Sequence, residues 1–180
     1  MESFIYNSPL GQLSITANEH SICSAHFISN EVHLSSSNNI VDSAFPSSPL
    51  FRQCQQQLTA YFNGTNLLFD LPLEQPGTEF QQKVWAGLLN IKAGATMSYL
   101  SFSKQLGNSK ATRAVGTANG KNNIAIIVPC HRVIGSNGQL AGYVGGLWRK
   151  QWLLQHEAKH CNGVVPLFDT EIFHQQSNTS

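Results

Sequence analysis

The spacing of apolar residues changes partway along the chain, and this change restricts the folds that the sequence can adopt. Near the start, Leu13, Ile15 and Ala17 alternate with polar neighbours, which is typical of a strand with one buried face. From residue 78 onward, apolar residues recur at helical intervals instead. The sequence therefore predicts an α+β protein built from a strand-rich part followed by a helical part.

The segment 71–77 is the predicted linker between these parts. It contains Pro72 and Pro76, which disfavour helix in the residues before them. We expect a small N-terminal α+β domain at 1–72, a C-terminal domain at 73–165 and a flexible polar tail at 166–180.

Capping residues and hydrophobic spacing predict the helices. One helix spans about 50–62 and ends at Gly64. Thr78 and Gln81 form a capping box at the start of the second domain. Ser98 and Ser109 can cap two short helices, 98–107 and 109–120, which together have the arrangement of a helix-turn-helix. A buried strand-like run at 124–128 and a last helix at about 147–161 complete the prediction.

Charge is segregated along the chain, although the formal net charge is only +1. Residues 1–79 contain one basic residue and seven acids, whereas residues 80–165 contain ten basic residues and one acid, Glu157. This asymmetry indicates a polyanionic partner for the second half, with a solvated basic surface as the alternative. Lys110, Arg113 and Lys121 lie on or next to the second short helix, whose other positions are small, and this favours DNA.

Other features argue against membrane and secreted classes. The longest apolar run is 124–128, far shorter than the ~20 residues of a membrane-spanning helix. The N-terminus lacks the pattern of a signal peptide. The four cysteines include no CxxC pair, so free thiols in a reducing compartment are expected. We therefore expect a cytoplasmic protein, or a nuclear one if its source is eukaryotic.

The combination of Cys130, His131 and Glu157 is the first candidate for chemistry. A thiol becomes a strong nucleophile as the thiolate, which a neighbouring base and positive charge favour. Glu157 lies on the last predicted helix and could orient the imidazole. A buried cysteine beside an incidental histidine is the alternative.

Two metal sites are weaker candidates. His156 to His160 match HExxH, a zinc-binding pattern, but Pro166 stands where the extended pattern requires a third histidine. We treat that match as accidental. Cys23, His26, His33 and Cys54 fit no common zinc spacing, so no metal is predicted.

Several strings resemble one known family, the O6-alkylguanine-DNA alkyltransferases, also called methylated-DNA–protein-cysteine methyltransferases. The resemblance covers about residues 78 to 160 and is highly specific. It rests on Phe80-Gln81, Val84-Trp85, Ser98-Tyr99, Arg113-Ala114-Val115-Gly116, Pro129-Cys130-His131-Arg132-Val133, Gly142-Tyr143, Gly145-Gly146-Leu147, Lys150 and Leu153-Leu154-Gln155-His156-Glu157. The first half resembles the family's ribonuclease-H-like domain only in Ser8-Pro9-Leu10-Gly11 and Tyr61-Phe62.

The resemblance implies single-turnover repair of O6-alkylguanine in DNA, with O4-alkylthymine left open, and no cofactor. Cys130 would accept the alkyl group, His131 oriented by Glu157 would help to form the thiolate, and Tyr99 would donate a hydrogen bond to the departing base. The carbonyls of Cys130 and Val133 would recognise the guanine amino group. Tyr143, Val144 and Gly145 would belong to the substrate pocket.

The expected partner is double-stranded DNA, bound by a monomer. Arg113 resembles the family's arginine finger, which fills the gap left by a flipped nucleotide, and Asn122 the asparagine that ties the recognition helix to the active-site loop. The predicted DNA-binding residues are Lys110, Arg113, Ala114, Gly116, Ala118 and Asn122. Asn123 stands where members of the family usually have proline, and Lys92 stands where many have proline. These departures leave open the rigidity of the two loops and the range of alkyl groups accepted.

Three other functions remain as alternatives. An alkyltransferase-like lesion sensor would flip the base without reacting, but such relatives lack the cysteine. A helix-turn-helix regulator would prefer one DNA sequence. A zinc protease would lose activity to chelators.

Overall fold

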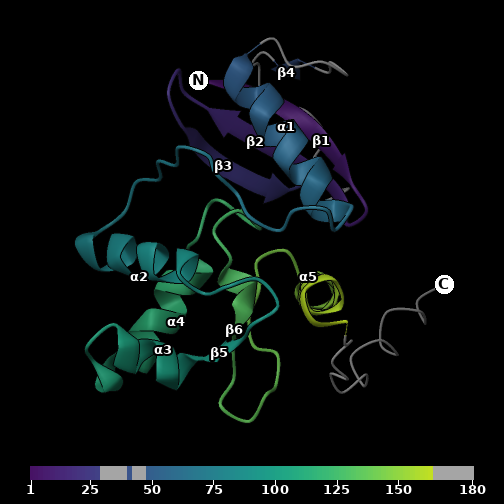
Figure 1. Ribbon diagram of the computed structural model, residues 1–180. Helices are drawn as coiled ribbons and strands as arrows, with labels where there is room; N and C mark the ends of the chain where they lie inside the picture. Colours follow the sequence, from purple (N-terminus) through teal and green to yellow (C-terminus); the bar gives the residue numbers. More distant parts are fainter. Residues whose placement is uncertain (29–39, 42–47, 164–180) are drawn as a thin grey trace, which may run out of the picture.

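The computed structural model describes residues 1–28, 40–41 and 48–163. The predicted tail, 166–180, therefore lies outside the described residues. The N-terminal part is a sheet covered by one helix, and the C-terminal part is mainly helical (Figure 1).

The sheet has the strand order β3-β2-β1-β4. Strands β1 (Glu2–Ser8), β2 (Gly11–Ala17) and β3 (Ile22–Phe27) form an antiparallel meander, and β4 (Ile40–Val41) pairs in parallel with β1. Their alternating residues supply the core, since Leu13 and Ile15 are fully buried. Gly11 closes the tight β1–β2 turn with a positive φ of 106°, which a residue with a side chain rarely adopts.

Helix α1 (Pro49–Phe62) lies across one face of this sheet, as Figure 1 shows. Its apolar stripe of Phe51, Cys54, Leu58 and Tyr61 is buried. The helix ends as the sequence predicts, with Gly64 in the left-handed conformation just beyond it.

The predicted linker region is not a loose connection, because it pairs with the sheet. Leu73 forms a parallel bridge with Ile22, which is held by hydrogen bonds from Ile22 N to Pro72 O and from Glu74 N to Ile22 O. The same strand, β3, also receives a segment of the second half, since Ala25 pairs with Ile124. Strand β3 therefore joins the two halves through backbone hydrogen bonds.

Helix α2 (Glu79–Leu89) begins with the predicted capping box, in which Gln81 N donates to Thr78 Oγ1 and Thr78 N donates to Gln81 Oε1. Strands β5 (Met97–Ser98) and β6 (Val133–Ile134) pair in parallel. This pairing brings the start of helix α3 (Tyr99–Gln105) next to the segment that follows Cys130.

Helices α3 and α4 (Thr112–Gly120) form the predicted helical pair, with two local differences. The 3-10 turn η1 (Ser109–Ala111) precedes α4, and Asn108 rather than Ser109 caps it, accepting from Lys110 N. The run 124–128 is buried as expected but forms turns instead of a strand, with Ile126 at a φ of 70°. Helix α5 (Leu147–Asn162) follows the prediction closely and ends at Gly163.

None of the helices within the described ranges has the length and apolar character needed to cross a membrane.

Candidate active site

Cys130 begins the 3-10 turn η2 (Cys130–Arg132), which follows the buried turns of 124–128. Its side chain is nearly buried, at 7% exposure, and its backbone N–H donates to Val128 O. Asn122 anchors the segment that leads into this turn, because its Nδ2 donates to Val128 O at 2.9 Å. A cysteine in this setting has a fixed position rather than a place on a mobile loop.

A pocket opens beside Cys130, with about 470 Å³ of empty space that includes some open solvent. Tyr143, Val144 and Gly145 line it, as the resemblance implies. Val133 does not, and its carbonyl accepts from Lys150 Nζ at 2.7 Å. The remaining lining residues are His26, Phe27, Asn119, Gly120, Asn122, Ala125 and Gly142.

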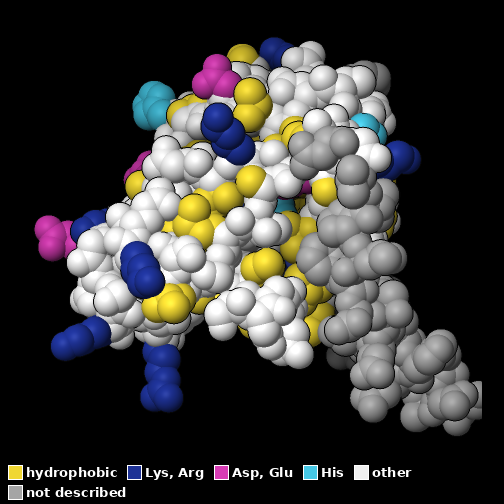
Figure 2. All heavy atoms as spheres, turned by 60° about the horizontal axis from the view of Figure 1, so that its bottom comes forward, with side chains coloured by type: hydrophobic (Ala, Val, Ile, Leu, Met, Phe, Trp, Pro, Cys, Tyr) yellow, Lys and Arg dark blue, Asp and Glu magenta, His cyan; other side chains and the backbone are white. Residues whose placement is uncertain are grey.

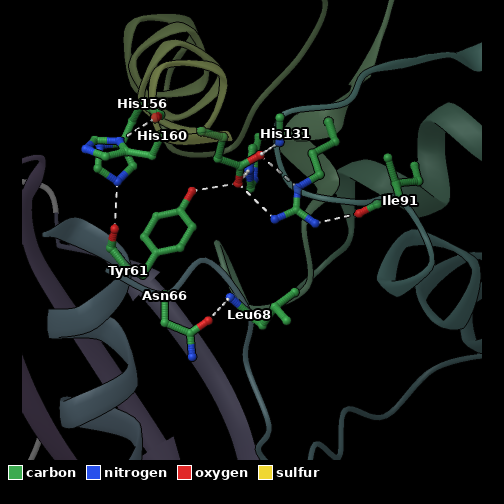
Figure 3. A network of polar contacts seen from close by, with 10 residues as sticks. Tyr61, Asn66, Leu68, Ile91, His131, His156 and His160 are labelled. Carbon is green, nitrogen blue, oxygen red and sulfur yellow. Dashed lines mark hydrogen bonds and ion pairs between the residues drawn. The ribbon is translucent and has the colours of Figure 1, made fainter. Parts of the chain in front are cut away.

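Behind the thiol, a buried carboxylate collects several donors from distant parts of the chain. Glu157 Oε1 receives Tyr61 Oη at 2.8 Å, His131 Nε2 at 2.8 Å and Arg132 Nη2 at 2.9 Å. Its Oε2 receives Arg132 Nε at 3.0 Å and Gly94 N at 3.2 Å. In Figure 3 a dashed line joins the Tyr61 hydroxyl to this carboxylate, and His131 lies beside it.

This network sets the charge on each partner. Burial alone would raise the pKa of Glu157, but the hydrogen bonds from His131 and Arg132 and the positive charge of Arg132 outweigh it and hold the pKa well below the ordinary value. Burial lowers the pKa of His131, although Glu157 opposes that shift. The pair at rest is therefore a carboxylate and a neutral imidazole.

The carboxylate also selects the tautomer of His131. Because Glu157 can only accept, His131 Nε2 carries the proton, which leaves the lone pair on Nδ1. This buried Nδ1 has no hydrogen-bond partner among the described residues. The ring is thus arranged as a base whose free nitrogen is available to a proton donor.

The Cys130 thiol needs such a base. Burial raises its pKa, while interactions with Asn122 and the nearby Lys150 charge lower it in part. Lys150 is itself fully buried, and burial lowers its pKa to about 8. Since the thiol's pKa remains raised overall, the resting side chain is protonated.

Tyr99 reaches this region because β5 pairs with β6. Its hydroxyl accepts a hydrogen bond from Asn119 Nδ2 at 3.2 Å, and the same nitrogen donates to Cys130 O at 3.4 Å. Burial raises the pKa of Tyr99, and the thiolate that forms at Cys130 raises it further, whereas the Asn119 hydrogen bond lowers it. Tyr99 and Cys130 are thereby linked through one amide.

The predicted DNA-binding residues fall into two groups. Lys110, Arg113 and Ala114 are exposed on η1 and α4, and Gly116 is partly exposed. Figure 2 presents this end of the molecule, from which separate Lys and Arg side chains project. Ala118, in contrast, is 2% exposed and its carbonyl accepts from Trp85 Nε1, so its assignment to the exposed face is corrected: its methyl packs in the core.

Asn122 is also buried, so it is an internal tie and not a surface contact. Its side chain bonds the end of α4 to Ile124 and Val128, the residues that lead to Cys130. The next residue, Asn123, uses the N–H that a proline would lack, donating to Gln75 Oε1 at 2.9 Å. Its carbonyl accepts from Ala25 N, so hydrogen bonds hold this loop where the family pattern has proline.

Four residues at the site had no role in the sequence-based prediction. Tyr61 and Arg132 complete the Glu157 network, Asn119 joins Tyr99 to Cys130, and Lys150 holds the carbonyls of Val133, Ala141 and Gly142. Lys150, Tyr61 and Arg132 belong to the strings that carry the resemblance, and this was the available signal. Asn119 lies outside those strings, so its role follows only from its contacts.

The HExxH residues do not face a common point. His156 Nε2 bonds Tyr61 O at 2.6 Å, His160 Nδ1 bonds His156 O at 2.8 Å, and Glu157 belongs to the network above (Figure 3). Within 1–28, 40–41 and 48–163, no three His, Cys, Asp or Glu side chains are grouped to hold a metal. His33 of the other weak candidate lies outside these ranges.

Models of two protein families cover most of the chain. The ribonuclease-like domain of 6-O-methylguanine DNA methyltransferase matches residues 3–75, and the DNA binding domain of the same enzyme matches residues 79–159. Together with the geometry around Cys130, these matches define the class: the chain belongs to the 6-O-methylguanine DNA methyltransferase family.

Individual relatives agree with this assignment. A methylated-DNA–protein-cysteine methyltransferase of Methanosarcina acetivorans is 43% identical over 153 residues, which cover 85% of this chain and 96% of the relative. One from Mycolicibacterium paratuberculosis is 51% identical over 119 residues, or 66% of this chain and 72% of the relative.

Solved structures show the same fold. A crystal structure of Mycobacterium tuberculosis OGT in complex with DNA is 39% identical, with a TM-score of 0.78, and covers 89% of this chain and 94% of that one. The fold class and the enzyme class expected from the sequence, a ribonuclease-like domain followed by a DNA-binding domain with methyltransferase activity toward DNA, are confirmed.

Proposed function

We propose that this protein repairs O6-alkylguanine in double-stranded DNA by moving the alkyl group irreversibly to its own Cys130. The observation that carries the proposal is the arrangement of the thiol: Cys130 borders an open pocket and lies directly before the buried His131–Glu157 pair. The family and its DNA-methyltransferase relatives support the substrate class.

The reaction begins with removal of the thiol proton. His131 accepts it at Nδ1 through a water molecule, and Glu157 stabilises the imidazolium that forms. The thiolate then attacks the carbon bound to guanine O6. The S–C bond forms as the C–O bond breaks, and the electron pair of that bond leaves with the base.

Tyr99 assists the departure of the base by donating a hydrogen bond as negative charge develops on it. The product is a thioether with no easy hydrolytic exit. Each molecule therefore reacts once, and no cofactor takes part.

The DNA contacts come from the exposed side of η1 and α4. Lys110 contacts phosphate, while Ala114 and Gly116 let the helix approach the minor groove closely. Arg113 fills the space left by the flipped nucleotide, since the target carbon is inaccessible in a stacked duplex. Asn122 supports this helix from inside.

Further assignments complete the proposal. The domains are 1–72 and 73–165, with 166–180 as a tail. The protein acts as a monomer in the cytoplasm, or in the nucleus if its source is eukaryotic. The carbonyls of Cys130 and Val133 receive the guanine amino group with their second lone pairs, since Asn119 and Lys150 use the first. Tyr143, Val144 and Gly145 form the pocket wall.

Mass spectrometry of the reacted protein tests the proposal. After mixing with a duplex that contains O6-methylguanine, the peptide holding Cys130 should gain one methyl group, and the Cys130→Ser variant should gain none. An unmodified Cys130 peptide in a protein that binds the duplex fully would indicate a lesion sensor. Protection of one preferred sequence without a lesion would indicate a regulator.

A further inference from the structure

Asn119 occupies an unusual position between the two reactive side chains. It lies near the end of α4, is 3% exposed and lines the pocket beside Cys130. Its side-chain nitrogen contacts both Tyr99 Oη, at 3.2 Å, and the carbonyl oxygen of Cys130, at 3.4 Å. No role follows for it from the family motifs in the sequence.

The Cys130 contact determines which way the amide faces. A carbonyl oxygen can only accept, so the nitrogen of Asn119, and not its oxygen, must point toward Cys130. The amide group has two N–H bonds, and the two contacts use both of them. The side-chain oxygen is left buried without a hydrogen-bond partner among the described residues.

This orientation has a consequence for the tyrosine. Because Asn119 donates to Tyr99 Oη, the hydroxyl acts there as an acceptor, and its single proton points away from the amide. A hydroxyl that accepts one hydrogen bond becomes a stronger donor in another. The Asn119 contact is also the influence that lowers the pKa of Tyr99 against the effects of burial and of Cys130.

We propose that Asn119 is a positioning residue for alkyl transfer, which directs the Tyr99 proton toward the departing base and keeps that donor at a fixed place relative to Cys130. The inference rests on the proposed function and deepens it. The unpartnered Oδ1 of Asn119 fits this role. A buried acceptor without a partner is unfavourable, so an amide in this position is explained by a need for its two N–H donors.

Other contacts do not supply this function. Lys150 Nζ lies 5.9 Å from the centre of the Tyr99 ring and donates to three carbonyls, so it does not reach the hydroxyl as a donor. A side chain placed at Gly116 would meet carbon atoms of the Tyr99 ring and not its hydroxyl. Among the described residues, Asn119 is the one whose side chain bonds the Tyr99 hydroxyl.

A double-mutant cycle tests the inference. The rate of Cys130 alkylation is measured with free O6-benzylguanine, which needs no DNA contact from α4, for the unsubstituted protein, Asn119→Leu, Tyr99→Phe and the double variant. Asn119→Leu should slow the reaction about tenfold, the factor expected for one hydrogen bond of ordinary strength. In the Tyr99→Phe background the same change should alter the rate by less than about twofold, since paired residues are not additive.

Asn7→Leu is the matched control, because Asn7 is exposed on β1 and its side chain bonds Gln12, outside the site. It should react at the unsubstituted rate. Thermal unfolding confirms that each variant is folded, and Asn119→Met replaces Asn119→Leu if the latter does not fold.

The outcomes separate the two proposals. Equal slowing in both backgrounds, or no slowing in either, overturns the role of Asn119 and leaves the proposed function intact. If the unsubstituted protein does not alkylate Cys130 with either the free base or the duplex, the proposed function fails and this inference fails with it.

Discussion

Glu157 shows how one side chain combines structural and chemical work. Its two oxygens accept from Tyr61, His131, Arg132 and the backbone of Gly94, and it is fully buried. A buried carboxylate is costly unless every lone pair is satisfied and a cation neutralises it. Arg132 provides that cation, so His131 can remain neutral and serve as the base.

Replacing Glu157 with glutamine should therefore destabilise the protein as well as slow it. Glu157→Gln leaves the Arg132 guanidinium buried without a countercharge, and we expect a loss of about 3–5 kcal/mol in the free energy of unfolding. Urea denaturation measures this loss. Glu19→Gln, at an exposed position, is the control and should leave the unfolding midpoint within error.

The pH dependence of stability should change in the same variant. The pKa of Glu157 is lowered by folding, so its stabilisation is present above the ordinary carboxyl pKa of about 4.3 and is lost as the pH falls below it. The pKa of His131 is also lowered, which adds a loss that begins as the pH falls below about 6.5. An acid unfolding curve for Glu157→Gln that matches the unsubstituted curve would contradict this.

The sequence predicted the site residues best where a reactive side chain also lies within a family motif. Cys130, His131 and Glu157 could be selected because a thiol, an imidazole and a single acid stand out in a basic half. The roles of Arg132 and Tyr61 could not be predicted, since an arginine or a tyrosine has no reactivity that singles it out before its contact with Glu157 is known. Asn119 was missed because its role depends on bonding both Tyr99 and Cys130, which only the fold brings together.

At the level of elements, α4 has an exposed side and a buried side. Arg113 and Ala114 are exposed, whereas Val115, Ala118 and Asn119 are buried. Helical spacing predicted the helix but not which small residues face outward, because an alanine is compatible with either side. Fewer residues of α4 therefore lie on its exposed side than its many small and polar residues suggested.

Arg113→Ala should separate DNA contact from chemistry. Filling the gap left by a flipped nucleotide matters only in a duplex, where unstacking costs a few kcal/mol, so we expect at least about a tenfold loss of rate on O6-methylguanine duplex. The rate with free O6-benzylguanine should be unchanged. Arg52→Ala removes one positive charge from α1 and serves as the control.

Equal losses with duplex and free base would instead indicate that Arg113 supports the fold.

The turns at 124–128 also differ from what hydrophobic spacing predicts. Their apolar run predicted burial correctly, but the left-handed Ile126 and the bonds from Asn122 redirect the chain, and neither is visible as hydrophobic spacing.

At the level of the whole molecule, Arg149 of α5 connects the pocket wall to the ribonuclease-like half. Its Nε donates to Leu10 O at 2.8 Å and its Nη1 to Gly145 O at 2.7 Å. The guanidinium lies 4.4 Å from the ring centres of both Phe27 and Trp148. The first domain therefore helps to shape the pocket in which the second acts.

Arg149→Ala should weaken this connection. We expect a loss of about 1–3 kcal/mol in the free energy of unfolding, from charge-assisted hydrogen bonds and cation–π contacts. Hydrogen exchange should become faster in the backbone of 142–147. Arg149→Lys keeps the charge without the planar fork and should give an intermediate loss; unchanged exchange in Arg149→Ala would contradict the role.

Tyr61 extends this dependence to the chemistry itself. Its hydroxyl and His131 share a single oxygen of Glu157, and its carbonyl meets His156. A hybrid that joined the second half of this chain to the first half of another homologue would need a phenol in the place of Tyr61. Without that phenol, the second half would bury Glu157 with one hydrogen-bond donor missing. The two halves therefore have to be exchanged together when such hybrids are engineered.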